Sequence, residues 1–215
     1  MTHVFMKPGY LGLVIALFSL SISPSIAFAE KNQEAGIEGT ATAIDLKNSE
    51  FTWRANKKIG SGHYGNIFLQ SATAEIKDGK IQSAEFIMNM KSFTVTDLRG
   101  RMQRRFMNHV KSGDFFEVEK YPTARLVIEE QVDDTTVRGQ LTIKEQTQPI
   151  TIQFTQNEGI YQGTMTFDRT QFGITYNSEN FVKVAADQII QDEVTLEFKV
   201  ALKAPKAAPK VAQEN

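Results

Sequence analysis

Apolar and polar residues alternate with a period of two along most of the middle of the chain. The apolar positions Phe51, Trp53 and Ala55 are each followed by a polar residue. Asp78-Gly79 is typical of a hairpin turn. Similar alternating runs occupy residues 84–90, 124–128, 137–143, 150–154, 161–167 and 194–200. Successive side chains of a strand point to opposite faces, so each run predicts a strand with one buried face. About seven or eight such strands predict an all-β fold, a closed antiparallel barrel or a sandwich, and closure is attractive because it removes exposed edges.

One segment, residues 97–110, departs from this period. Its apolar residues recur every fourth position, at Leu98, Met102, Phe106 and Val110. This spacing predicts an amphipathic helix, which Thr94 or Thr96 could cap and Gly113 could end. A single helix between the strands of a barrel is well placed to plug or gate one mouth.

The two ends of the chain lack this strand pattern. Lys7, an apolar run and Ala27-Phe28-Ala29 are typical of a signal peptide cleaved after Ala29, and the run is shorter than the ~20 residues that span a bilayer. The C-terminal residues are rich in Ala, Pro and Lys, which cannot bury a core. The predicted organisation is a signal peptide at 1–29, a loose leader at 30–44, the barrel domain at 45–202 and a disordered tail at 203–215.

Composition and charge exclude several classes of protein. The formal net charge of −1 gives no electrostatic footprint for nucleic acid. The absence of cysteine excludes disulfides and a lipid-modified N-terminal Cys. One local exception is the basic cluster Arg99, Arg101, Arg104 and Arg105. This cluster is either a solvated helix face or a surface that docks onto anionic lipid head groups, which would make peripheral membrane contact.

Residues suited to catalysis do not form a recognisable constellation. No Gly-x-Ser-x-Gly elbow or phosphate-binding glycine loop occurs. His63 and His109 are far apart and lack the spacing of metal ligands, so we expect no metal site. Asp168 beside Arg169 is better explained as a structural ion pair. We therefore expect neither an enzyme nor a catalytic cofactor.

Six ordered segments carry a family resemblance. The run Gly113 to Ala124, GDFFEVEKYPTA, resembles the FFDVxxYPxA signature of YceI-like proteins. The other matching segments are Trp53, Gly62-His63-Tyr64-Gly65, Gly139 to Ile143 with Gln148-Pro149-Ile150, Phe167 to Ile174, and Asp192-Glu193-Val194. The resemblance runs from Phe51 to Leu202. Glu117 departs from the usual Asp, and Glu145 stands where Gly is common, which would alter one turn.

The resemblance implies a fold, a ligand class and a location. YceI-like proteins are described as eight-stranded, antiparallel, lipocalin-like barrels that bind a polyisoprenoid or isoprenoid quinone in an apolar cavity, typically in the periplasm. The alternation alone also allows a barrel filled by its own side chains. The resemblance favours the hollow barrel, so we expect a secreted periplasmic protein that transports or stores a long apolar lipid.

The expected tunnel wall combines inward-facing strand residues with aromatic residues that follow the helix. These residues are Trp53, Phe86, Met88, Met90, Phe115, Leu141, Ile143, Phe154, Met165, Phe167, Phe172, Ile174 and Tyr176. His63 and Arg169 are possible head-group contacts, although a surface histidine and a structural arginine are the more ordinary interpretations.

Two other functions remain open at this point. One is a periplasmic protein with a filled core that binds a partner protein through its outer surface. The other is an enzyme acting on a lipid through Asp168 or His63. The sequence also leaves open whether the chain forms a homodimer.

Overall fold

The computed structural model describes residues 41–203. The predicted signal peptide, most of the predicted leader and the tail beyond Lys203 lie outside these residues. The sheet begins at Ala41 rather than at residue 45, so the last residues assigned to the leader belong to strands.

Ten strands and one α-helix make up this part of the chain. The strands are β1 (Ala41–Thr42), β2 (Ile44–Lys57), β3 (His63–Asn66), β4 (Phe68–Lys77), β5 (Lys80–Asn89), β6 (Thr123–Asp133), β7 (Thr136–Ile143), β8 (Gln146–Asn157), β9 (Ile160–Asp168) and β10 (Ile190–Leu202). The helices are α1 (Gly100–Val110) and two short 3₁₀ turns, η1 (Met90–Ser92) and η2 (Arg169–Phe172).

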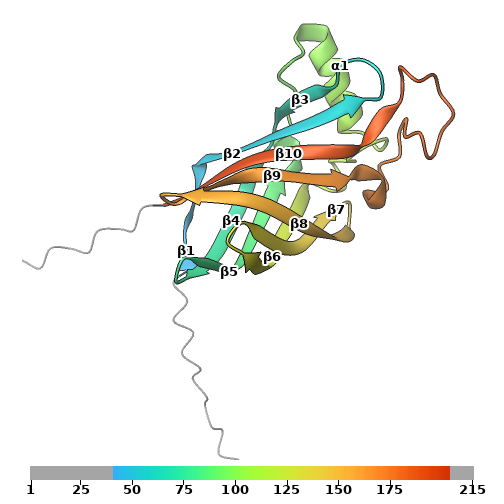
Figure 1. The fold of residues 1–215 in the computed structure, drawn as a ribbon. Helices are drawn as coiled ribbons and strands as arrows, with labels where there is room; N and C mark the ends of the chain where they lie inside the picture. The colour runs from blue at the N-terminus through green and yellow to red at the C-terminus, as the bar shows by residue number, and fades with distance from the viewer. Residues whose placement is uncertain (1–40, 204–215) are drawn as a thin grey trace, which may run out of the picture. The chain divides into compact units, whose positions relative to one another are not determined.

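The strands form one antiparallel sheet that curls into a barrel (Figure 1), in the order β1-β4-β5-β6-β7-β8-β9-β10-β2-β3. Only Ala43 separates β1 from β2, and only Ile67 separates β3 from β4. The two edges of the sheet therefore belong to neighbouring segments, 41–57 and 63–77, which pair through β1–β4 and through β2–β3. The ten strands are thus eight extended chain segments. The predicted all-β antiparallel barrel with one helix is confirmed.

Tight hairpin turns set the register of three strand pairs. Asp78-Gly79, Lys144-Glu145 and Glu158-Gly159 each place both residues at positive φ. Two-residue turns of this kind match the twist of the strands they join. Glu145 has a φ of 63° and keeps the conformation that glycine would adopt more easily. Its departure from the family pattern leaves the turn intact.

The helix is shorter than the sequence predicts. It begins at Gly100 rather than at residue 97, and Arg99 at its N-cap makes no capping bond through its side chain. The predicted caps, Thr94 and Thr96, bond to carbonyls of β3 instead. Phe106 and Val110 pack into the core, whereas Met102 is exposed. Leu98, which precedes the helix, also packs against the core, so Met102 is the one residue of the predicted apolar stripe that is exposed.

Candidate binding cavity

The barrel is hollow. A cavity of about 230 Å³ lies inside the sheet, and its walls expose almost only apolar atoms. The cavity follows the length of β2, from Ile44 at one end to His63 and Asn56 at the other. Phe106 and Val110 of α1 contribute to its wall, so the helix covers the end that contains His63.

Most of the predicted tunnel residues lie on this wall. They are Trp53, Phe86, Met88, Met90, Phe115, Leu141, Ile143, Phe154, Met165, Phe167 and Ile174. Sequence reasoning missed several others, among them Phe51, Phe93, Phe106, Phe116, Ile152, Leu196, Phe198 and Val200. The alternation could have found Phe51 and the β10 residues, because they share a face with Trp53 or with one another.

Phe172 and Tyr176 do not line the cavity, so their placement on its wall was wrong. The prediction extended a strand through this stretch, but residues 169–172 form η2 and Gly173 adopts a φ of 72°. Period-two spacing therefore does not apply. Phe172 packs edge-on against Phe167, with ring centroids 5.7 Å apart. Tyr176 is 37% exposed and contacts His109 and Phe115.

Trp53 is held in place by its neighbours. Its indole Nε1–H donates to the Thr94 carbonyl over 2.8 Å. Its ring stacks on Phe93 with a centroid distance of 4.6 Å, and on Phe106 of α1 at 6.1 Å. With its polar atom satisfied, Trp53 presents a fixed apolar surface to the cavity.

Arg169 is buried and held by hydrogen bonds within the protein. The whole residue is buried, at 2% exposure. The guanidinium and Nε donate to the carbonyls of Ile174, Ile190 and Gln191, and to Asp192 over 3.1 Å. Burial lowers the pKa of Arg169, and the nearby Asp192 and Asp168 partly offset that effect. These bonds tie β10 to the loop after η2 and leave little donor capacity for a head group.

The free edge of β3 is covered by the segment between η1 and α1. The Thr94 N–H donates to Asn66, and the Thr96 N–H donates to Tyr64, as in an added strand. The segment lies so close that a Cβ on Gly65 would collide with the Thr94 carbonyl. This packing places Asp97 next to β3.

His63, the first residue of β3, meets Asp97 at this edge. Its Nδ1 lies 2.8 Å from Asp97 Oδ2, and its ring packs edge-on against Phe106 at 4.6 Å. Burial alone would raise the pKa of Asp97, but hydrogen bonds from His63 and the Tyr64 N–H outweigh it and lower that pKa. Asp97 is therefore ionised at neutral pH.

Within residues 41–203, no group of three or more His, Cys, Asp or Glu side chains could hold a metal ion. No helix there has the length and hydrophobicity required to cross a bilayer.

Comparisons with known proteins agree with this architecture. The YceI-like domain model matches residues 42–202. BcnA of Burkholderia cenocepacia superposes with a TM-score of 0.57 at 20% identity, covering 73% of this chain and 98% of that one. A polyisoprenoid-binding domain from Saccharophagus degradans, implicated in plant cell wall breakdown, gives a TM-score of 0.54 at 13% identity, covering 77% and 99%. No curated protein matches the chain. At these identities the two structures demonstrate a shared fold.

The fold and the cavity define a class: an antiparallel β-barrel with an apolar interior cavity and one covering helix. Within that class, the chain belongs to the YceI-like family.

Proposed function

We propose that this protein holds one long apolar lipid, a polyisoprenoid or isoprenoid quinone, in its barrel and serves as a periplasmic carrier or store rather than as an enzyme. The cavity is the observation that carries this proposal, because its walls offer a ligand almost no polar atoms. Each methylene buried there contributes about 0.8 kcal/mol.

The dimensions favour a slender chain. At about 230 Å³ the cavity is smaller than the ~300–1,000 Å³ typical of pockets for bulkier ligands. Met88, Met90 and Met165 line it, and unbranched methionine side chains adapt to a ligand's shape. The hollow interior supports this proposal over a filled core that acts only through its surface.

A blocking substitution tests the proposal. Ala84 lies on the cavity wall, and its neighbour Ser83 is exposed on the same strand. Ala84→Phe should fill the cavity and abolish lipid binding, whereas Ser83→Phe should leave binding intact. Mass spectrometry of solvent extracts from natively purified protein measures the bound lipid. If solvent extracts of the wild-type protein contain no isoprenoid lipid, the proposal is contradicted.

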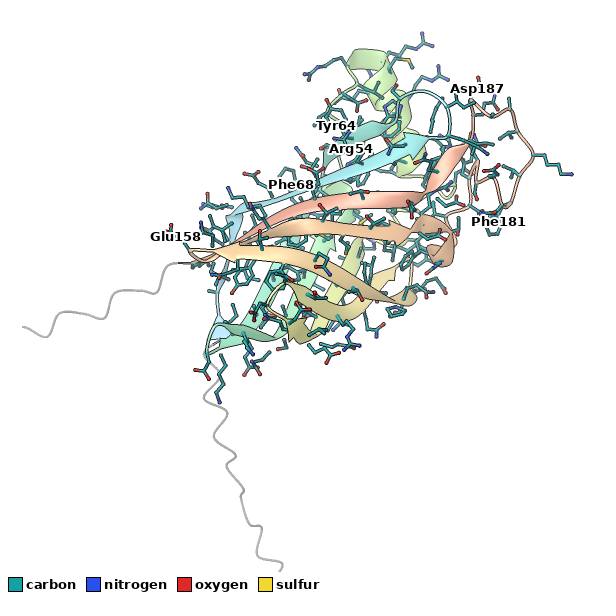
Figure 2. All side chains as sticks on the ribbon, in the orientation of Figure 1. Arg54, Tyr64, Phe68, Glu158, Phe181 and Asp187 are labelled. Atoms are coloured by element: carbon teal, nitrogen blue, oxygen red, sulfur yellow. The ribbon has the colours of Figure 1, made fainter. Side chains whose placement is uncertain are left out.

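The covering helix also supports a membrane-docking role. Arg99, Arg101, Arg104 and Arg105 are exposed, and none forms a salt bridge within residues 41–203. The loop between η2 and β10 contacts α1 through Tyr176 and His109, and it exposes Phe181 (Figure 2). Basic and apolar groups together suit an anionic lipid surface. Docking there would bring one end of the cavity to the bilayer.

Charge-matched variants test this role. Arg104→Gln with Arg105→Gln should weaken cosedimentation with vesicles that contain phosphatidylglycerol, most clearly at low salt. Lys77→Gln with Lys80→Gln removes the same charge from the β4–β5 hairpin and should have little effect. If both double variants lose the same amount of vesicle binding, the attraction comes from the overall charge of the protein and not from a docking face.

The periplasmic location rests on the signal-peptide pattern and is tested separately. Protein expressed from the full chain should be released with the periplasmic fraction and should begin at Glu30. An uncleaved N-terminus would overturn the predicted cleavage after Ala29.

A further inference from the structure

The two edges of the sheet meet along a line that backbone hydrogen bonds close at its two ends. At one end β1 pairs with β4. At the other end the Ile67 N–H donates to the Phe51 carbonyl over 3.1 Å, and β2 continues into its pairing with β3. Between these points residues 44–50 of β2 run beside residues 68–73 of β4, and no strand pairing within residues 41–203 joins them. We call these two stretches the seam.

Local hydrogen bonds hold the two sides of the seam apart. The β2 side bulges, because its register with β10 shifts between Asp45 and Glu50, and Ser49 Oγ donates to the Asp45 carbonyl. On the β4 side, the Phe68 N–H donates to Ser92 Oγ over 2.9 Å instead of to β2. Separation of the two sides therefore breaks no strand ladder, whereas separation of any two paired strands would break one.

The cavity lies directly behind the seam. Ile44 and Phe51 of β2 and Ala74 of β4 line its wall. β4 has no buried residue along its length, whereas β7, which is paired on both edges, buries most of its side chains. The seam stretch of β4 also carries the small side chains of residues 71–73. Little packed material therefore separates the cavity from solvent along this side of the barrel.

An exposed apolar side chain flanks the seam on each side. Leu46 is 38% exposed on the β2 side, and Phe68 is 54% exposed on the β4 side (Figure 2). A single exposed apolar side chain is ordinary on a protein surface. These two, however, border the stretch without strand pairing, where they offer an apolar ligand its first contact outside the barrel.

The end of the barrel beneath α1 is closed by aromatic contacts instead. Phe106 of α1 stacks on Trp53 and packs edge-on against His63. His109 of the same helix packs against Tyr176 with ring centroids 4.6 Å apart. Entry at this end would require these contacts to separate.

From these observations we infer that a lipid enters and leaves the cavity sideways through the seam, between β2 and β4, and not beneath α1. This inference rests on the proposed lipid-binding function and adds the route to the binding site. A lateral route suits a long chain, because the chain can pass along part of its length and need not be threaded end-on.

A reversible crosslink across the seam tests this route. The chain has no cysteine, so Leu46→Cys with Ser71→Cys supplies its only thiols, one at an exposed position on each side of the seam. A bis-methanethiosulfonate reagent joins the two thiols, and dithiothreitol releases them. Stopped-flow quenching of Trp53, the one tryptophan of the chain, reports the uptake and release of 1-bromooctane, because Trp53 lies on the cavity wall.

The crosslink should change the rates but not the affinity. Uptake and release of 1-bromooctane should both slow about tenfold, since the two sides can no longer part, and Kd should stay unchanged. Reduction of the same sample should restore both rates, which excludes damage to the fold by the substitutions.

Two control pairs carry the same crosslink elsewhere. Thr164→Cys with Glu197→Cys joins β9 to β10 at residues that are already paired, and it should leave the rates unchanged. His109→Cys with Tyr176→Cys ties α1 to the loop between η2 and β10, and it should also leave them unchanged.

The outcomes separate failure of the route from failure of the proposed function. The route is overturned if the seam crosslink leaves uptake as fast as in the reduced protein, or if the α1 crosslink slows uptake. If the wild type does not bind 1-bromooctane at all, the proposed lipid-binding function itself is contradicted.

Discussion

Individual side chains in this barrel have roles that depend on their partners rather than on their type. Arg169 is the one buried charged residue within residues 41–203, and its N–H groups donate hydrogen bonds to backbone carbonyls and to Asp192. His63 has only two ring nitrogens, and one of them, Nδ1, pairs with Asp97. The difference comes from surroundings that are distant in sequence: Asp192 is 23 residues from Arg169, and Asp97 is 34 residues from His63.

Removing the Arg169 side chain should destabilise the barrel severely. Arg169→Met leaves three carbonyls and Asp192 without their buried donor, which typically costs about 3 to 5 kcal/mol of unfolding free energy. Urea denaturation measures the change. The control is Arg125→Met, which breaks an exposed ion pair with Glu85 and should cost about 0 to 1 kcal/mol. Similar costs for both variants would contradict the structural role of Arg169.

Tyr161 should make the protein sensitive to alkaline pH. Burial raises the pKa of Tyr161 above its ordinary value of about 10. The unfolded chain therefore loses this proton at a lower pH than the folded chain does. The stability contribution is complete below pH ~10 and is lost as the pH rises through the folded pKa. The unfolding free energy of Tyr161→Phe should fall less steeply above pH ~10, while Tyr64→Phe, at an exposed position, should follow the wild type.

Strands and turns follow local patterns closely, and the helix follows them less well. The hairpin at Lys144-Glu145 forms despite the absence of glycine, because two strands with complementary faces hold it in register. The helix loses its predicted first turn, because Thr94 and Thr96 bond to β3 instead of capping it.

Relief of backbone strain at this hairpin should stabilise the protein. Glu145→Gly removes a Cβ from a residue at a φ of 63° and should raise the unfolding free energy by about 0.5 to 1 kcal/mol. Glu145→Ala removes the charge but keeps the Cβ, so thermal unfolding of the two variants separates the effects. An equal gain in Glu145→Ala would attribute the stabilisation to charge.

At the scale of the whole molecule, part of the barrel interior is a cavity rather than a packed core. Inward side chains that could pack against one another leave about 230 Å³ unfilled. Empty volume costs stability, since the surrounding atoms lose their contacts. A ligand that fills the cavity restores those contacts.

Bound lipid should therefore stabilise the fold. Delipidated protein should melt at a lower temperature than protein purified with its lipid, and octanol should raise the Tm in a concentration-dependent way. Ala84→Phe, with its cavity filled, should show no such dependence. A Tm of the wild type that does not respond to any of these lipids would contradict a binding site in the barrel.

Sequence patterns predicted the tunnel well where strands run regularly, and failed where they do not. Met165 and Phe167 lie on one inward face of β9, as the alternation indicates. Phe172 and Tyr176 were assigned by the same rule, but η2 and Gly173 had already ended the strand. The pairing of His63 with Asp97 had no signal in the sequence, because it depends on how the segment after η1 covers β3.

The sequence by itself determined most of the strands, the single helix, the family and the apolar character of the inner wall. These follow from the chemistry of neighbouring residues, since side-chain direction alternates along any strand. Only the tertiary structure decided that the interior is hollow and that Arg169 bonds to carbonyls. Each of these depends on how side chains from every strand meet across the barrel, and that spacing is set by register and closure rather than by any local pattern.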